Sequence, residues 1–290
     1  MTDQPPVALT IAGSDSGAGA GIQADLKTMG ALGVFGVTAI TAVTAQNTAT
    51  VAGVHPVPAA FVEQQVATLL ADLPVAATKT GMLGNAETIA VVGGFAGSGA
   101  LPNLVVDPVM VSSSGQPLLD DGGVAAYREL LLPFALVVTP NLWEAALLCG
   151  RDPRGLTDEE GMADAARTIH AMGAAWVLVK GGHLAGVEPS PGTPAASAVP
   201  DVLYGGSTVT VLTAEWVDTP NTHGTGCSLS AAIAAQLASG AEVATAVADA
   251  KAYVNRALAG AAGWRLGKGH GPLDHFGGPV APRRSPLPRK

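Results

Sequence analysis

The chain has 290 residues, of which 48% are hydrophobic and 13% charged, and its formal net charge at pH 7 is −8. This length suits one large α/β domain, and the negative charge gives nucleic-acid binding no electrostatic support. The sequence holds no uninterrupted apolar stretch long enough for a membrane helix, no signal-peptide pattern and only two cysteines. We therefore expect a cytoplasmic protein that binds neither nucleic acid nor membranes.

Strand-like and helix-like segments alternate along the chain. Short apolar runs predict strands at 7–12, 37–43, 75–80, 104–106, 136–138 and 176–180. Helical spacing of apolar residues predicts helices at 20–32, 59–70, 85–95, 123–132, 142–149, 158–172, 224–238 and 242–262. The segments 51–57 and 207–212 are less regular, and we expect edge strands or hairpins there.

Buried strands that alternate with helices are typical of a mostly parallel sheet. We expect a three-layer α/β fold in which helices cover both faces of a central sheet, with one domain over residues 1–278. The Pro- and Ser-rich segment 188–200 predicts a flexible loop insertion, and residues 279–290 predict a disordered tail.

Polar and glycine residues follow the ends of the predicted strands. They stand at 13–21, 46–47, 81–83, 107–110, 139–144 and 181–183. Because ligands bind beyond the carboxyl ends of the strands in open parallel sheets, we expect a binding site at this edge. The glycines at 13–21 do not have dinucleotide-binding spacing, and the chain has no Walker A motif.

The segment 221–227 (Asn-Thr-His-Gly-Thr-Gly-Cys) leads directly into a predicted helix. Gly224 and Gly226 allow a tight turn that exposes backbone N–H groups, and the helix dipole favours an anion there. A cysteine in that position has a lowered pKa, so we expect Cys227 to take a proton from a substrate hydroxyl during phosphoryl transfer. The alternative is an ordinary helix cap followed by a small buried cysteine.

Seven motifs in this order resemble the hydroxymethylpyrimidine/phosphomethylpyrimidine kinases of thiamine biosynthesis, which belong to the ribokinase-like superfamily. The motifs stand at 12–27, 44–47, 79–83, 107–110, 139–145, 179–183 and 221–227, and the resemblance covers about residues 7–276. It implies an ATP-dependent kinase that phosphorylates 4-amino-5-hydroxymethyl-2-methylpyrimidine and then its monophosphate. It also implies ATP and Mg²⁺ as cofactors, a ribokinase-like fold and a homodimer.

The resemblance further implies a role for individual residues. The substrate ring would be bound by Gly13, Ala18, Asp25, Gln46, Met82 and Val109. The nucleotide would be bound by Asn141, Lys180 and Thr225, and Mg²⁺ by Asp107 and Glu144. The transferred group would be stabilised by the backbone of Gly224, Thr225 and Gly226, with Cys227 as the base.

Several alternatives remain open at this stage. Many superfamily members carry Asp where this chain has Cys227, and Cys also occurs in related enzymes that accept pyridoxal. A pyridoxine/pyridoxal kinase and a non-catalytic pyrimidine sensor are therefore the competing hypotheses. Glu144 could be an ordinary first-turn helix acid, and His223 is interpreted as structural rather than catalytic. Ala18 stands where a glycine is more usual, and we expect the alanine to be tolerated if its φ is negative.

Overall fold

The computed structural model describes residues 4–111, 118–120, 122–152, 155–156, 158–182 and 199–277. The strands found there form one sheet in the order β3-β2-β1-β4-β5-β6-β7-β8-β9. Their bounds are Val7–Ser14, Phe35–Gln46, Val51–Pro56, Val75–Thr80, Val105–Val106, Val137–Val138, Trp176–Lys180, Val199–Tyr204 and Val209–Ala214, for β1 to β9. The neighbouring strands in the run β2-β1-β4-β5-β6-β7 are parallel to each other. The pairs β3–β2, β7–β8 and β8–β9 at the two edges are antiparallel.

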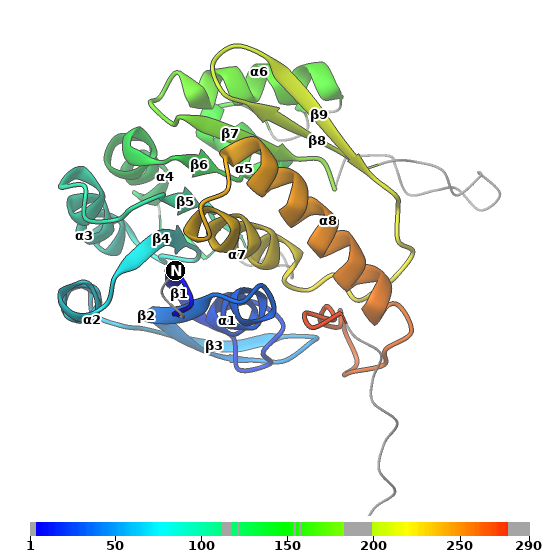
Figure 1. Ribbon diagram of the computed structural model, residues 1–290, viewed down its shortest axis with the longest axis horizontal. Coiled ribbons are helices and arrows are strands. Elements are labelled where there is room, and N and C mark those ends of the chain that lie inside the picture. The colour runs from blue at the N-terminus through cyan, green and yellow to red at the C-terminus, as the bar shows by residue number, and fades with distance from the viewer. Residues whose placement is uncertain are drawn as a thin grey trace, which may run out of the picture.

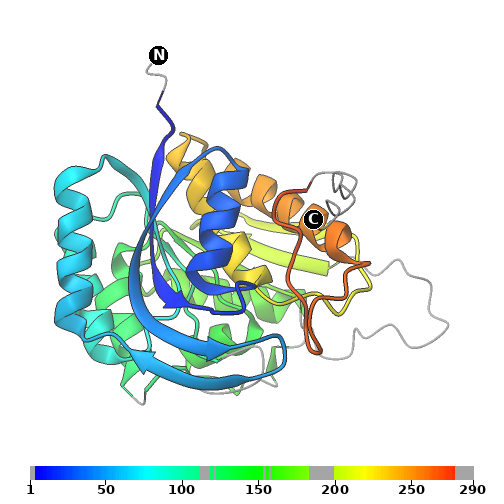
Figure 2. The ribbon, with the colours of Figure 1, turned by 90° about the horizontal axis from the view of Figure 1, so that it is seen from below.

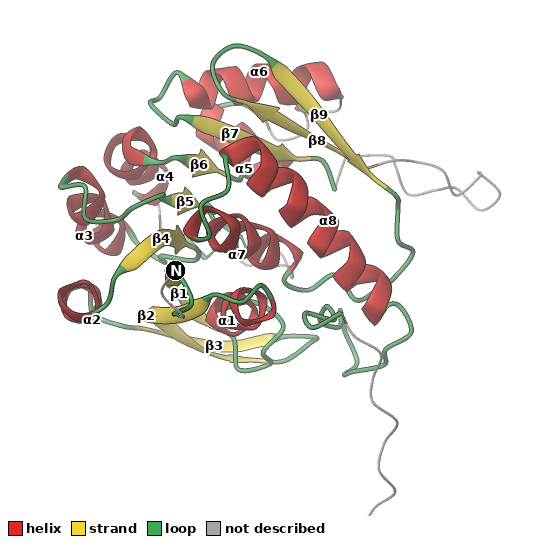
Figure 3. Ribbon diagram, viewed as in Figure 1, coloured by secondary structure: helices red, strands yellow, loops and turns green. Residues whose placement is uncertain are grey.

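Helices cover both faces of this sheet (Figures 1 and 3). One face packs against α2 (Ala59–Asp72), α3 (Ala86–Gly97), α4 (Gly123–Ala126), α5 (Leu142–Cys149) and α6 (Glu159–His170). The other face packs against α1 (Gly21–Ala31), α7 (Thr225–Ala238) and α8 (Val243–Ala261). The three-layer α/β fold expected from the sequence is thereby confirmed.

The side-chain alternation of the strands explains why two layers of helices are needed. In β1, Leu9 and Ile11 point into the core on the α2–α6 side, whereas Ala8 belongs to the core on the α7–α8 side. In β5, Val106 and Val105 divide in the same way. Because successive side chains of a strand point to opposite faces and both are apolar here, each face must be covered.

Two elements differ from the sequence-based expectation. The chain after α4 continues as a π-helical turn over Tyr127–Leu131 and a 3₁₀ turn over Leu132–Phe134, not as one regular helix. Strand β8 was missed, since residues 199–200 were assigned to a loop. Pro200 pairs only with Thr213 of β9, because the pairing of β8 with β7 begins at Asp201. The rest of the predicted loop, 188–198, and the predicted tail, 279–290, lie outside the described residues.

The long strand β2 extends beyond its pairing with β1 and forms a hairpin there with β3. β1 pairs with the segment of β2 that ends at Val43, and β3 pairs with the segment from Ala42 to Gln46. Figure 2 shows this two-stranded ribbon curving away beneath β1. The ribbon therefore forms a side wall at the carboxyl end of the sheet. In the part of the chain that the structure describes, no helix combines the length and apolar character needed to cross a membrane.

Candidate active site

A cavity of about 690 Å³ lies at the carboxyl ends of the parallel strands. All the predicted site residues except Ala18 and Asp25 line it. Those that do are Gly13, Gln46, Met82, Asp107, Val109, Asn141, Glu144, Lys180, Gly224, Thr225, Gly226 and Cys227. Residues that are far apart in the sequence thus meet at one edge of the sheet, as parallel strand topology requires.

The first turn of α7 forms a cradle of backbone N–H groups. Gly224 is its N-cap, with φ of 90°, and no side chain caps the helix there. A Cβ at this position would collide with the carbonyl oxygen of Gly19, so glycine is required for space as well as for conformation. The Thr225 N–H is engaged by the Thr222 carbonyl at 3.3 Å, so an anion would rely on the following N–H groups of the turn.

Lys180 and Asp107 lie beside this cradle. The Lys180 Nζ is 3.0 Å from Asp107 Oδ1, and its side chain is 15% exposed against 2% for Asp107. The Ser230 hydroxyl oxygen of α7 lies 3.2 Å from Asp107 Oδ2, within hydrogen-bond distance. The ion pair therefore joins the end of β7 to the end of β5 and to α7. Its ammonium group reaches the cavity, where it can neutralise phosphate charge.

Glu144 is buried in the same wall, where it also caps α5. Its Oε2 accepts the Asn141 N–H and the Asn141 Oδ1 accepts the Glu144 N–H, both at 2.8 Å. Burial, opposed by the Lys180 ammonium and reinforced by the Asp107 charge, raises the pKa of Glu144 to about 7. Glu144 is thus an acidic residue of the first helical turn, as one interpretation of the sequence had it. The same residue also lines the cavity.

The donor set fits a magnesium ion held partly by its substrate. Asp107 and Glu144 are two buried carboxylates whose charges repel each other, and a divalent cation would relieve that repulsion. Among the described residues no group of three His, Cys, Asp or Glu side chains gathers at a metal-binding distance. Mg²⁺ commonly takes one or two carboxylates and completes its shell with water and phosphate oxygens. The pair is therefore sufficient for that ion and unsuited to an all-protein cage.

Cys227 lines the cavity one residue after Gly226, but its electrostatics differ from the expectation. Burial raises the pKa of its thiol to about 11, although the Lys79 ammonium and a hydrogen bond from the Gly21 N–H act to lower it. The Asp25 and Asp107 carboxylates add to the increase. The predicted lowering of the pKa is therefore wrong. The N–H groups of the helix do not outweigh desolvation and two nearby negative charges.

Another part of the cavity lining is suited to a small ring. Gln46 presents a side-chain amide, and Met82 and Val109 supply apolar surface. A Cβ at Gly13 would collide with the Met82 Cε, so the glycine leaves room for the methionine to stand in the wall.

Asp25 does not line the cavity, which differs from its predicted place beside the substrate ring. Its side chain is fully buried, and both of its oxygens accept hydrogen bonds from the Lys79 Nζ at 2.8 Å. The Thr10 hydroxyl donates to Asp25 Oδ2 at 2.6 Å. Both oxygens of its carboxylate are therefore engaged by protein groups. Lys79 is the member of the pair that lines the cavity.

Ala18 corrects two further expectations. Its φ is 60°, a left-handed conformation that costs a residue with a Cβ about 1 kcal/mol or more, and it does not line the cavity. The Ala18 N–H donates to the Asp15 carbonyl at 2.9 Å, and its own carbonyl accepts a hydrogen bond from the Lys27 Nζ at 2.8 Å. These two bonds hold the strained turn in place.

Three residues in or beside the cavity had been given no functional role. Asp15 accepts hydrogen bonds from the N–H groups of Gly17, Gly19 and Ala20 and so shapes the first loop. His223 lies 2.9 Å from the same carboxylate. Lys79 is a lysine inside an apolar strand. Such a residue requires a buried acidic partner, and this requirement is a sequence signal that could have identified it.

Comparison with known proteins agrees with this geometry. The family model described as phosphomethylpyrimidine kinase matches residues 15–274. A hydroxymethylpyrimidine/phosphomethylpyrimidine kinase of Rhizobium meliloti is 51% identical over 93% of this chain and 97% of that protein. The thiamine biosynthesis bifunctional protein ThiED of Geobacter sulfurreducens is 46% identical over 92% of this chain and 52% of its own length.

A solved structure extends the comparison to the fold. Pyridoxal kinase from Staphylococcus aureus, determined in complex with AMP-PCP and pyridoxal, superposes with a TM-score of 0.82 at 38% identity. The match covers 94% of each chain. Such overlap in fold and sequence confirms the ribokinase-like architecture and the kinase class. The chain belongs to the phosphomethylpyrimidine kinase family.

Proposed function

We propose that the cavity transfers the terminal phosphoryl group of ATP to the hydroxymethyl group of 4-amino-5-hydroxymethyl-2-methylpyrimidine. A second transfer to the resulting monophosphate then gives the diphosphate used in thiamine biosynthesis. The observation that supports this proposal most is that two kinds of group line the same cavity. One is the Gln46 amide with apolar side chains, and the other is the turn of backbone N–H groups at 224–226 with Lys180. The cavity volume of about 690 Å³ lies in the range of small-molecule sites.

At the ring end, the Gln46 amide pairs with the aminopyrimidine edge, because an amide offers a donor and an acceptor side by side. Met82 and Val109 form the apolar walls against the ring, and Gly13 allows the chain to approach it closely. These assignments are supported by the position of all four residues in the cavity lining.

At the phosphate end, Lys180 and the N–H groups of the α7 turn bind phosphate oxygens, with Asn141 and Thr225 beside them. Asp107 and Glu144 hold Mg²⁺, which when bound neutralises charge on the phosphate oxygens. This arrangement supplies the positioning and electrostatic stabilisation on which phosphoryl transfer mainly depends.

The substrate hydroxyl gives its proton to the Cys227 sulfur as the new O–P bond forms and the bond to ADP breaks. With a pKa of about 11, roughly one thiol in 10⁴ is deprotonated at pH 7. The rare thiolate is a strong base, and the Lys79 ammonium and Gly21 N–H stabilise it. Because the transition state of phosphoryl transfer is loose, a base of low occupancy is sufficient for a modest turnover rate.

The assembly and the cellular location are further parts of the proposal. Val43 on β2 and Val54 on β3 are 48% and 46% exposed, and they stand on the antiparallel ribbon at the edge of the sheet. Exposed apolar surface on an edge ribbon favours pairing with a second copy, in a homodimer. Both cysteines are free, as is usual in the reducing cytoplasm.

The test is ADP release by the purified protein with the 4-aminopyrimidine alcohol and with pyridoxal. We expect release with the pyrimidine and a lower kcat/KM with pyridoxal. Higher kcat/KM with pyridoxal would favour a pyridoxal kinase. If calorimetry shows that the pyrimidine binds while ADP release stays at background, the protein is a sensor and the kinase function is contradicted.

A further inference from the structure

A chain of hydrogen bonds runs behind the ring end of the cavity. The His223 Nε2 lies 2.9 Å from Asp15 Oδ2 and 3.3 Å from the side-chain nitrogen of Gln46. The other end of the Gln46 amide lies 3.3 Å from the Thr44 Oγ1. All four residues line the cavity. The direction of each hydrogen bond in this chain can be determined from its two ends.

At the first end, Asp15 can only accept. Burial alone raises the pKa of Asp15, but hydrogen bonds from His223 and from the N–H groups of Ala20 and Gly17 outweigh it and lower that pKa. The carboxylate is therefore ionised at neutral pH and has no proton to donate. It follows that the His223 Nε2 carries a hydrogen, which it donates to Asp15 at 2.9 Å and shares with the Gln46 amide at 3.3 Å.

At the second end, Thr44 has only one hydroxyl hydrogen. That hydrogen is donated to the Ser14 carbonyl at 2.9 Å, and a carbonyl oxygen cannot donate in return. The Thr44 Oγ1 can therefore only accept a hydrogen bond from Gln46. Both ends of the chain constrain the same amide group.

The two constraints agree with each other. With its nitrogen toward His223 and its oxygen toward Thr44, Gln46 would set donor against donor and acceptor against acceptor. Turning the amide by half a rotation satisfies both contacts without moving any other atom, and oxygen and nitrogen in an amide are assigned from such networks. We infer that His223 and Thr44 fix the Gln46 amide with its oxygen toward His223 and its nitrogen toward Thr44.

This polarity determines which ring edge the site accepts. The amide keeps one free lone pair on the His223 side and one free N–H on the Thr44 side. It therefore matches a ring with an exocyclic amino donor next to a ring-nitrogen acceptor. A 4-oxo ring has an acceptor oxygen in place of the amino donor and a ring N–H in place of the ring-nitrogen acceptor. Its oxygen would face the amide oxygen of Gln46, and its ring N–H would face the amide N–H. His223 and Thr44 are thus positioning residues for substrate specificity, an inference that rests on the proposed function.

The experiment compares kcat/KM for the 4-amino substrate and its 4-oxo analogue in matched variants. In Thr44→Val and in His223→Phe the Gln46 amide loses one of its two constraints, and we expect the 4-amino to 4-oxo ratio of kcat/KM to fall about tenfold. Thr44→Ser keeps the hydroxyl and should retain the wild-type ratio. His270→Gln, which removes another histidine of the cavity lining, is the control and should also leave the ratio unchanged.

A wild-type ratio in both Thr44→Val and His223→Phe, with equal losses for the two substrates, would overturn the inference in favour of a purely structural role. Failure of the wild type to release ADP with the 4-amino compound would instead contradict the proposed function. In that case the ratio of the dissociation constants for the two analogues, measured by calorimetry on the same variants, decides the polarity of Gln46.

Discussion

A Cβ added at Gly226 would stand 3.2 Å from the Lys180 Nζ and 3.9 Å from Asp107 Oδ2. The absence of a side chain at this helix position therefore leaves space for the ammonium group of Lys180, from β7, beside the first turn of α7. In the proposed reaction, the sheet edge and the helix N-terminus would therefore act on the same phosphate group, one through a charged side chain and the other through backbone N–H groups.

Gly226→Ala tests this close approach. The new methyl group would push the flexible Lys180 side chain away from the cradle, and small displacements at a phosphate site are costly for the rate. We expect kcat/KM for ATP to fall roughly 10- to 100-fold. The melting temperature should not fall, since alanine is favoured over glycine inside a helix by about 1 kcal/mol.

The matched control is Gly94→Ala in α3, where a Cβ would meet nothing within 4 Å. It should gain stability without any loss of activity. A Gly226→Ala enzyme as active as this control would show that Lys180 does not need that space.

The buried pair of Lys79 and Asp25 predicts a strong coupling between the two residues. Desolvation opposes charge on both, but the Asp25 carboxylate raises the pKa of Lys79 and keeps it protonated. Lys79→Met would leave an uncompensated carboxylate, so we expect the free energy of unfolding to fall by about 3–5 kcal/mol in urea titrations. The double variant Lys79→Met/Asp25→Asn should recover much of that loss. Additive losses would show that the two groups are not coupled.

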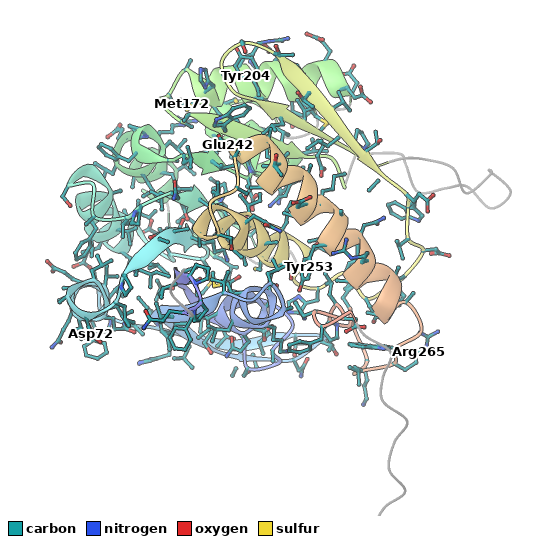
Figure 4. The ribbon with its side chains drawn as sticks, in the orientation of Figure 1. Asp72, Met172, Tyr204, Glu242, Tyr253 and Arg265 are labelled. Atoms are coloured by element: carbon teal, nitrogen blue, oxygen red, sulfur yellow. The ribbon has the colours of Figure 1, made fainter. Side chains whose placement is uncertain are left out.

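His275 predicts how stability depends on pH. Its ring is buried, its Nε2 lies 3.0 Å from the Ser228 Oγ, and Tyr253 of α8, labelled in Figure 4, donates its hydroxyl to the His275 carbonyl. Burial, helped by the Lys27 charge, lowers the pKa of His275 from 6.5 to about 4. Between these two pH values the unfolded chain binds a proton that the folded chain does not.

The free energy of unfolding should therefore fall as the pH drops from 6.5 to 4, by up to about 3 kcal/mol from this residue. Urea unfolding at several pH values measures the slope. His275→Gln should reduce it, whereas His55→Gln on the exposed edge strand β3 should not. Equal slopes in wild type and His275→Gln would refute the assignment.

Much of the site could be predicted from sequence because it follows a topological rule. Gln46, Asp107 and Lys180 each come at or next to the end of an apolar strand, and parallel strands bring such ends together. Gly224 and Cys227 were found in the same way, at the start of a helix. Local patterns were sufficient to place a site at this edge, whereas the role of each residue came from the resemblance to known kinases.

The rest depended on partners that are distant in the chain. Asp25 was assigned to the substrate ring through the resemblance, and its buried partner, Lys79, is 54 residues away and is not part of any local pattern. The direction of the Cys227 pKa shift was wrong because the glycine turn is visible in the sequence while the surrounding burial and carboxylates are not. Strand β8 was missed because Pro200 is typical of a loop. The proline is tolerated there because the pairing of β8 with β7 begins only at Asp201.

The raised thiol pKa itself can be measured by alkylation. In Cys149→Ala, Cys227 is the one remaining cysteine, so labelling by iodoacetamide reports on it alone. With a pKa of about 11, the labelling rate should rise about tenfold per pH unit between pH 8 and 10. A plateau below pH 8 would mean that the thiolate is stabilised, as the sequence alone had suggested.

In the proposed reaction, Cys227 accepts the proton of the pyrimidine alcohol within the phosphate cradle. The most direct test of this step is kcat of Cys227→Ala with the 4-aminopyrimidine alcohol, measured alongside the dissociation constant of ATP. We expect kcat to fall about 10²- to 10⁴-fold with ATP affinity unchanged within about twofold. A kcat within about twofold of the wild type would contradict the account.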